Sequence, residues 1–221
     1  RISNAIRNGI PTTTMMAWQN VLSEKEIDAL VDYIMLSQES EEIDLAIDLP
    51  DSIQTHNYIL EIENLVSHDL STPWAIEFID ESTALVSERS GGLKWLVNDQ
   101  LDPQPVNGLP KTHLESSTGG FMDIALDPEY SKNQWIYLAY SHTNGNIKDP
   151  NALALTKIVR GKIDNYEWVQ EQVLFEMEDS LMVVNGNRWG CRFLFDNDKL
   201  LFSIGDMGKA LDSQDPSKAT G

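Results

Sequence analysis

The chain has 221 residues, of which 41% are hydrophobic, and 35 acidic side chains outnumber 16 basic ones to give a formal net charge of −19. This charge argues against nucleic acid and anionic membrane surfaces as partners, because both would be repelled. No stretch approaches the roughly 18 apolar residues of a membrane span. The single cysteine, Cys191, rules out an internal disulfide and a Cys-x-x-Cys metal site, and we expect it to be an inert packing residue.

The two ends of the sequence indicate a fragment of a longer protein. The first residue is Arg1 rather than Met, no signal peptide precedes it, and the last residues, Ala219-Thr220-Gly221, follow a loop. Targeting signals therefore give no compartment.

Residues 1–38 are predicted to be helical, with a loop before the main helix. Ser23 followed by Glu26 is a capping box, which marks a helix N-terminus. The apolar residues that follow recur at the spacing of one helix face; they are Ile27, Leu30, Val31, Ile34 and Met35. The stretch 39–55 is acidic and weakly apolar, which predicts a linker.

From residue 56 to residue 221 the pattern is that of short strands punctuated by Gly, Pro, Asn and Asp, and no helical pattern intervenes. This predicts an all-β region built as an antiparallel sandwich, barrel or propeller. The predicted strands are Tyr58–Glu63, Trp74–Ile79, Ala84–Glu88, Leu93–Val97, Phe121–Ala125, Trp135–Tyr140, Ala152–Arg160, Gln172–Glu176, Arg192–Phe195 and Leu200–Ile204.

Internal similarity favours the propeller among these three architectures. Divergent copies of one unit, an apolar strand, an Asp turn and a second apolar strand, begin at Trp74, Phe121 and Arg192. Their separation of roughly 45–70 residues is near the blade period of propellers. Roughly three blades fit the chain, and three blades cannot close a ring, which agrees with a fragment.

A loop before the main helix resembles the C-terminal part of class I cytochrome c. The matching residues run from Asn8-Gly9-Ile10-Pro11 through Thr14-Met15-Met16-Ala17-Trp18 to Leu22-Ser23. The resemblance implies that Met15 is an axial ligand of haem iron in a complete cytochrome domain, where a thioether ligand raises the haem potential. Met16 stands where the family usually has Pro. The alternative is a buried Met15 that packs on Trp18 and the helix.

The block 187–208 is predicted to be a hairpin that presents Asp206 between Gly205 and Gly208, where glycines permit a sharp turn and a close approach to a ligand. It resembles the active-site hairpin of the soluble PQQ-dependent sugar dehydrogenases, which are six-bladed β-propellers. The matching residues are Gly190, Arg192, Phe195, Asp196, Ile204, Gly205 and Asp206.

This resemblance implies PQQ and calcium as cofactors, Arg192 as a cofactor-binding residue, and Asp206 as the acid that hydrogen-bonds a general-base histidine. The position of that histidine is occupied by Arg188. A guanidinium stays protonated at ordinary pH and cannot act as a base, although it can clamp a carboxylate by paired hydrogen bonds. Asp206 would then act as the base itself.

Two further motifs extend the resemblance. The segment from Pro73 to Leu93 is similar to the first blade of that family; within it Glu88 and Arg89 either face the mouth of the ring or form a corner salt bridge. The segment 116–130 is similar to the next blade. It places Thr118 where the family has a substrate-side glutamine, and it implies Thr118 and Gly119 as cofactor-binding residues. Asp127, at the end of its strand, is expected to lie in a turn. The four histidines, His56, His68, His113 and His142, fall in predicted loops and are expected to be solvated.

The sequence therefore predicts an oxidoreductase that oxidises the CH–OH group of an aldose or related sugar and passes electrons from PQQ to a fused haem c or another cytochrome. Export to the periplasm or the extracellular space is implied by the resemblance alone. A non-catalytic propeller that binds a ligand or protein at its mouth is the alternative, because Arg188 and Thr118 depart from the family's active site. A third hypothesis is an acidic substrate with Arg188 as its clamp.

Overall fold

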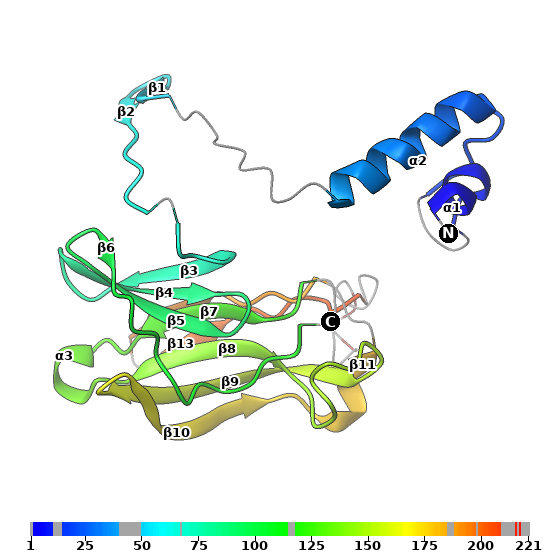
Figure 1. Cartoon of the computed structure of the whole chain (residues 1–221). Helices are drawn as coiled ribbons and strands as arrows, with labels where there is room; N and C mark the ends of the chain where they lie inside the picture. The colour runs from blue at the N-terminus through cyan, green and yellow to red at the C-terminus, as the bar shows by residue number, and fades with distance from the viewer. Residues whose placement is uncertain are drawn as a thin grey trace. The chain divides into compact units, whose positions relative to one another are not determined.

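The computed structural model describes residues 2–10, 15–39, 50–66, 68–114, 118–184, 188–197, 199–208, 215 and 217. The chain divides into two compact units, Arg1–Ile62 and Glu63–Gly221. Strands predominate and the helices are few (Figure 1). Among the residues described, no helix is long and apolar enough to cross a membrane.

In its described residues, the first unit contains two helices and a small hairpin. Helix α1 (Ile2–Asn8) buries Ile6, and helix α2 (Glu24–Glu39) begins at the predicted capping box. The Ser23 N–H donates to Glu26 Oε2 (2.8 Å), and the Glu26 N–H donates to Ser23 Oγ (3.4 Å), so this prediction is confirmed. Strands β1 (Ser52–Gln54) and β2 (Ile59–Glu61) pair antiparallel, and β1 lies inside the stretch predicted as a linker.

The predicted apolar face of α2 is covered only in part. Ile27 is fully buried, but Leu30 and Met35 are 41% and 43% exposed. Helix α1 is short and contacts one part of this face, so the remainder stays open within this unit.

The second unit starts with a four-stranded antiparallel sheet. Its strands are β3 (Pro73–Phe78), β4 (Thr83–Glu88), β5 (Gly92–Val97) and β6 (Gln100–Leu101), and they pair in chain order. The first strand keeps an apolar row in solvent: Trp74 is 39%, Ile76 is 46% and Phe78 is 65% exposed.

The next sheet repeats this order. Strands β7 (Phe121–Leu126), β8 (Ile136–His142), β9 (Leu153–Asp164) and β10 (Glu167–Glu176) pair antiparallel in chain order, and β11 (Val183–Val184) pairs with β9. A 3₁₀ turn spans Asp179–Leu181. Strands β12 (Phe193–Asp196) and β13 (Lys199–Phe202) form a separate hairpin.

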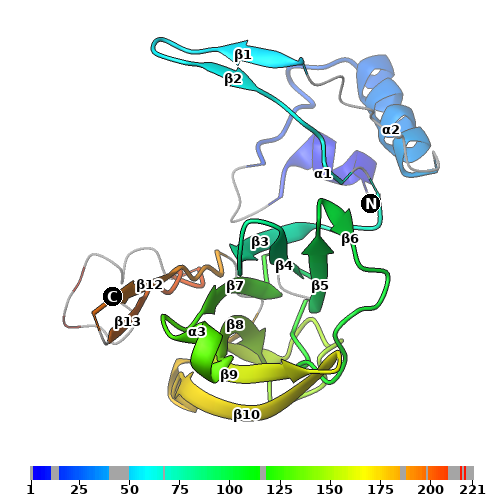
Figure 2. The ribbon, with the colours of Figure 1, turned by 90° about the vertical axis from the view of Figure 1, so that its left-hand side faces the viewer.

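The core lies between these sheets, and β3 runs beside β7 in both ribbon views (Figures 1 and 2). Leu85 and Leu93 of the first sheet pack on Phe121 and Leu138 of the second. A second cluster holds Met122 and Leu155 of the second sheet together with Trp189 and Cys191 beside the hairpin, and Phe193 packs against it. Each such fully buried side chain contributes about 1.5–3 kcal/mol, so burial fixes the hairpin against the second sheet.

The predicted strands are all found, with end shifts of up to five residues. Three expectations were wrong. Helix α3 (Tyr130–Asn133) interrupts a region predicted to lack helices, because Asp127 accepts bonds from the Glu129 N–H (2.9 Å) and the Asn133 side chain (2.7 Å) and tightens the turn. The turn role of Asp127 itself is confirmed.

The second and third wrong expectations concern histidines. His113 is only 1% exposed rather than solvated, because its backbone N–H donates to Ser141 O (2.9 Å) and draws the segment onto β8. His142 lies in β8 and not in a loop. His56 and His68 are exposed, as expected. Cys191 is buried and packed, as expected, and burial raises the pKa of its thiol to about 12.

Candidate functional site

The hairpin β12–β13 continues past its last paired strand residues toward the predicted site. The Ser203 N–H donates to Arg192 O (3.1 Å), and the Gly205 N–H donates to Gly190 O (2.9 Å). The two chain segments therefore stay side by side until Arg188 on one and Asp206 on the other. Of the predicted turn 196–198, residue 198 lies outside the described part of the chain.

Gly205 is the position where this close approach needs a glycine. A Cβ there would overlap the carbonyl oxygen of Arg188 and would lie 2.8 Å from the Gly190 nitrogen. At Gly190, by contrast, no atom of the described residues lies within 4 Å of the position that a Cβ would take, so the requirement is confined to one strand. The close contact between the two chain segments at Gly205 therefore sets the distance between Arg188 and Asp206.

Arg188 and Asp206 form an ion pair, with Nε 2.9 Å from Oδ1. The same carboxylate oxygen accepts the Gly208 N–H at 2.8 Å. The Arg188 side chain is 56% exposed and that of Asp206 is 19% exposed. Arg188 has a φ of 56°, in the left-handed region. A non-glycine residue held in that region is uncommon and is concentrated at functional sites.

Thr118, from the predicted motif 116–130, lies beside the residue that follows Arg188. Its Oγ1 accepts the Trp189 N–H at 3.0 Å. Next to it, Gly119 O accepts the Arg89 side-chain Nε–H at 2.8 Å. A Cβ on Gly120 would overlap the Arg89 carbonyl oxygen, so this loop lies tightly against the end of β4. Segments about 70 residues apart in the sequence are therefore tied together at Trp189.

Arg192, predicted to bind the cofactor, is held by a carboxylate that sequence reasoning missed. Its Nη1–H donates to Asp123 Oδ1 (2.8 Å), and the Phe193 N–H donates to Asp123 Oδ2 (2.7 Å). The Asp123 side chain is 10% exposed and that of Arg192 is 66% exposed. The signal for this pair was an acid in the middle of the apolar strand β7, since a buried carboxylate requires a partner.

An open cavity of about 280 Å³ lies beside these pairs within the second unit. Its lining comprises Trp74, Trp189, Gly190, Cys191, Arg192, Ser203, Ile204 and Gly205. The lining combines two indole rings, backbone polar groups and one guanidinium, a mixture typical of small-molecule sites.

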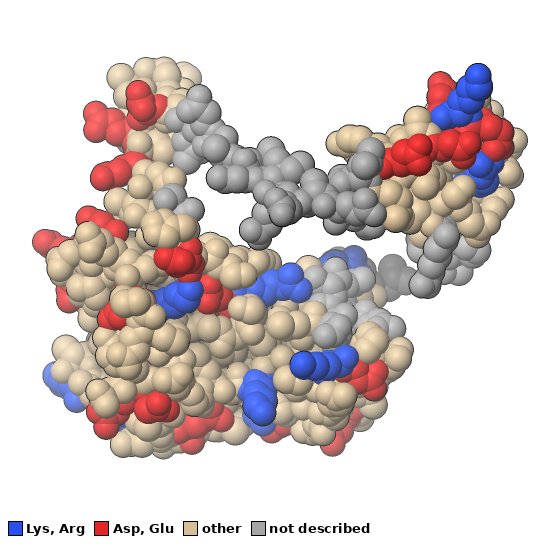
Figure 3. Space-filling view, in the orientation of Figure 1, with Lys and Arg blue, Asp and Glu red and all other residues tan. Residues whose placement is uncertain are grey.

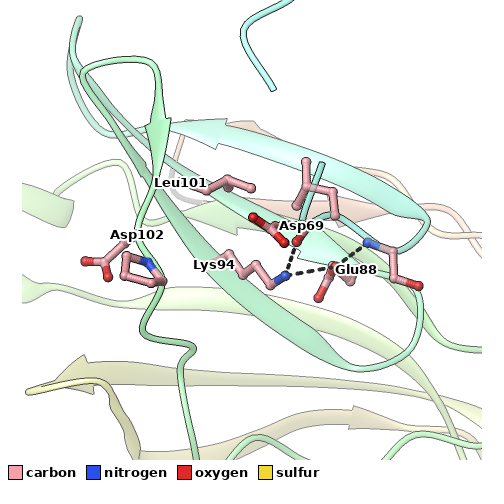
Figure 4. A pocket seen from close by; sticks show the side chains of 8 residues that line it. Asp69, Glu88, Lys94, Leu101 and Asp102 are labelled. Carbon is pink, nitrogen blue, oxygen red and sulfur yellow. Dashed lines mark hydrogen bonds and ion pairs between the residues drawn. The ribbon is translucent and has the colours of Figure 1, made fainter. Parts of the chain in front are cut away.

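A second hollow, of about 560 Å³, lies on the first sheet (Figure 4). Within it Glu88 Oε1 accepts the Ser71 N–H (2.6 Å) and lies 3.4 Å from Lys94 Nζ. Lys94 also donates to the Asp69 carbonyl oxygen. Glu88 thus forms a salt bridge with Lys94, while the Arg89 side chain donates to Gly119 O.

In the first unit Met15 lines an apolar cavity of about 300 Å³. The other lining residues are Ile6, Trp18, Leu22, Leu30 and Ile34. Met15 thus lies with Trp18 and the open part of the α2 face. Among the described residues of the whole chain, no cluster of three or more His, Cys, Asp or Glu side chains is placed to hold a metal ion.

Residues 70–221 match the family model described as Glucose / Sorbosone dehydrogenase. This segment covers more than half of the sequence, and the chain belongs to that family. The predicted relationship to sugar dehydrogenases is thereby confirmed, at the level of the family.

Two curated relatives show significant similarity. An uncharacterised protein of Synechocystis is 30% identical over 147 residues, which cover 63% of this chain and 34% of the relative. An aldose sugar dehydrogenase of Escherichia coli is 27% identical over 157 residues, which cover 69% of this chain and 40% of the relative. The matched part of the chain thus spans little more than a third of each relative.

Solved structures agree in fold. The apo-form of the soluble aldose sugar dehydrogenase from Escherichia coli has a TM-score of 0.56 at 24% identity, covering 66% of this chain and 41% of that one. The PQQ-bound form of an aldose sugar dehydrogenase from Streptomyces coelicolor has a TM-score of 0.55 at 20% identity, covering 72% and 45%.

Proposed function

We propose that the chain is part of a quinoprotein sugar dehydrogenase, an oxidoreductase that oxidises the CH–OH group of an aldose or related sugar with PQQ as the electron acceptor. Family membership of residues 70–221 supports a sugar oxidoreductase in general. The PQQ bound to the Streptomyces coelicolor relative supports the cofactor.

The observation that carries this proposal is the assembly around Trp189. The close contact of the two chain segments at Gly205 brings Asp206 to within 2.9 Å of Arg188. Thr118 Oγ1 accepts the Trp189 N–H at 3.0 Å. Residues assigned to one site from separate sequence motifs thus lie together at the end of one hairpin, next to a cavity. Loops at strand ends that are held by a rigid sheet are where β-folds place their chemistry.

Asp206 is the proton acceptor in this proposal. A general base must lie within hydrogen-bond reach of the proton that it removes. The Asp206 carboxylate is partly exposed and is oriented through one oxygen, Oδ1, by Arg188 and Gly208, so its second oxygen is the one that would accept the proton. Arg188 holds and orients Asp206, since a guanidinium cannot itself accept the sugar hydroxyl proton.

The residues around the cavity fit an anionic quinone in charge and in donor type. One N–H of the Arg192 guanidinium donates to Asp123. Because the side chain is 66% exposed, its other N–H groups can bind a carboxylate of the quinone. Thr118 and Gly119 flank the same end of the hairpin. When bound there, PQQ would supply a two-electron acceptor for the hydride of the sugar C1–H bond. Calcium, which the family resemblance implies, would need ligands other than an acidic or histidine cluster of the described residues.

For the architecture, we propose that the sheets β3–β6 and β7–β10 and the hairpin β12–β13 are successive blades of a six-bladed propeller. In each sheet four antiparallel strands follow one another in chain order, which is how propeller blades are built, and β11 adds to the second sheet beside β9. In domain terms, residues 56–221 are the N-terminal portion of the propeller and 39–55 are an acidic linker.

Residues 1–38 are, in this proposal, the C-terminal part of a cytochrome c domain. Met15 lies in an apolar cavity with Trp18 and Leu30, and an apolar wall beside a thioether suits a haem edge. A tethered haem c would accept electrons from the quinone one at a time at high effective concentration. Export to the periplasm or extracellular space belongs to the same proposal.

The test uses the complete polypeptide, reconstituted with PQQ and calcium, and follows the quinone absorbance while aldoses are added. Bleaching by a sugar is the expected result, and Asp206→Asn should slow it by roughly 10²–10⁴-fold, the usual contribution of general base catalysis. A protein that binds no PQQ would contradict the proposal.

A second function, a non-catalytic propeller that binds a ligand at its mouth, is favoured by one observation. Arg188 occupies the family's base position and engages the carboxylate that would serve the base. For this function, PQQ binding would be absent while a sugar or protein ligand still bound the cavity.

A further inference from the structure

The guanidinium of Arg188 is fixed at one edge and exposed elsewhere. Asp206 engages Nε at 2.9 Å, and the side chain remains 56% exposed. Arginine carries five N–H donors in a planar fork that matches a carboxylate. Because the Asp206 carboxylate is itself held by the Gly208 N–H (2.8 Å), the fork is oriented before any ligand arrives. Prior orientation lowers the entropy cost of binding.

Arg188 immediately precedes Trp189 and Gly190, which line the 280 Å³ cavity beside the hairpin. The Arg188 carbonyl oxygen abuts Gly205, and both Gly205 and Trp189 line the cavity. The cavity volume lies at the lower end of the range of small-ligand sites. Trp74, 39% exposed, offers an apolar wall for one face of a pyranose ring.

The negative charge of the rest of the chain makes the positive charge of Arg188 unusual. The chain has a net charge of −19, and acidic side chains are distributed widely over the face in Figure 3. An anion therefore gains nothing from the overall field and needs a specific cation. The arginine that lines the cavity, Arg192, lies 2.8 Å from the buried carboxylate of Asp123, which uses part of its donor capacity.

We propose that the substrate of this site is an acidic sugar, a hexuronate with a free C1 hydroxyl, and that Arg188 binds its carboxylate. This inference rests on the proposed function. The uronate carboxylate is unchanged in the reaction: the C1–H and O–H bonds break, a C=O bond forms to give the lactone, and two electrons and two protons pass to the quinone acceptor. Arg188 is a specificity-determining residue, and Asp206 remains the base.

The experiment compares D-glucuronate with D-glucose, which differ only at C6, in calorimetric titrations of the complete polypeptide without quinone. We expect D-glucuronate to bind and Arg188→Gln to weaken its binding at least tenfold, a larger factor than for D-glucose. Arg188→Lys, which keeps the charge but loses the planar fork, should recover part of the affinity. Arg160→Gln is the charge-matched control, since Arg160 lies on β9 over the Trp135 ring and bonds Gln172.

The inference is overturned if D-glucuronate does not bind, or if Arg188→Gln, with an unchanged thermal midpoint, binds D-glucuronate as tightly as the native protein. In that case the PQQ-loaded enzyme can still oxidise D-glucose, and the proposed function stands. If instead D-glucuronate binding depends on Arg188 but the loaded enzyme oxidises neither sugar, the proposed function fails and the acid-binding site stands. In the loaded enzyme, Arg188→His should shift kcat/KM from D-glucuronate toward D-glucose.

Discussion

Two arginines near the start of the hairpin β12–β13, Arg188 and Arg192, each pair with an aspartate, and the two pairs have different physical roles. In the pair of Arg192 and Asp123 the carboxylate is 10% exposed and also accepts the Phe193 N–H, so it ties the hairpin to β7. In the pair of Arg188 and Asp206 the carboxylate is 19% exposed and also accepts the Gly208 N–H of its own loop, while both guanidinium groups are more than half exposed. The first pair joins elements, whereas the second is positioned for a ligand.

Removal of Asp123 should have the largest effect on stability. Asp123→Ala leaves the Phe193 N–H without its partner and removes a carboxylate that is 10% exposed, although its partner Arg192 is 66% exposed. This loss costs about 1–3 kcal/mol. Chemical denaturation of the complete polypeptide measures this free energy of unfolding. A loss below about 1 kcal/mol would place this pair in the same class as an exposed one.

Cys191 lies in the sequence between Arg188 and Arg192, and the reactivity of its thiol measures how well this segment excludes solvent. Burial raises the pKa of its thiol to about 12, from an ordinary value of 9.0. At pH 8 the thiolate fraction should therefore be lower by roughly a thousandfold, and labelling by a disulfide reagent correspondingly slower than in the denatured chain. Rapid labelling of the native protein would show that the segment opens independently of global unfolding.

Gly205→Ala tests the close contact between chain segments that brings Arg188 and Asp206 together. The added Cβ overlaps the Arg188 carbonyl oxygen, so the backbone must shift, at a cost of about 1–3 kcal/mol. Gly190→Ala is the matched control, because no atom of the described residues lies within 4 Å of the position that its Cβ would take. Equal thermal midpoints for the two variants would contradict this account.

Asp206→Ala should have the smallest effect on stability. Its partner Arg188 is 56% exposed, and pairs with a solvent-exposed partner contribute about 0–1 kcal/mol. Its other bond, from the Gly208 N–H, lies within its own loop. The same denaturation measurement as for Asp123→Ala completes the comparison. A cost equal to that of Asp123→Ala would mean that the outer pair is structural and that the functional proposals lose their main support.

Much of this fold could be predicted from the sequence, because strand period and turn chemistry are local. The strands of the two larger sheets and of the hairpin follow short apolar runs between turn residues, and two residues, Ser23 and Glu26, are sufficient to predict the capping box. Contacts between residues far apart in the sequence could not be predicted in this way. Nothing near His113 in the sequence indicates that a backbone bond to Ser141 would bury it.

The candidate site was predicted in part. The hairpin motif identified Arg188, Arg192 and Asp206, and the structure places Arg188 beside Asp206. The bond from the Trp189 N–H to Thr118 and the partnership of Arg192 with Asp123 both join residues about 70 positions apart. Such pairs depend on how the sheets pack, and no local pattern specifies them.

The exposed apolar row on β3 affects the behaviour of the chain in solution. Ile76 and Phe78 are 46% and 65% exposed on the first strand of their sheet, while the chain carries a net charge of −19. At low ionic strength like-charge repulsion keeps copies apart, but at about 1 M salt the screening length falls to roughly 3 Å. Colloidal stability then depends on this row, and light scattering should rise with salt in the native chain but not in a variant with polar residues at both positions.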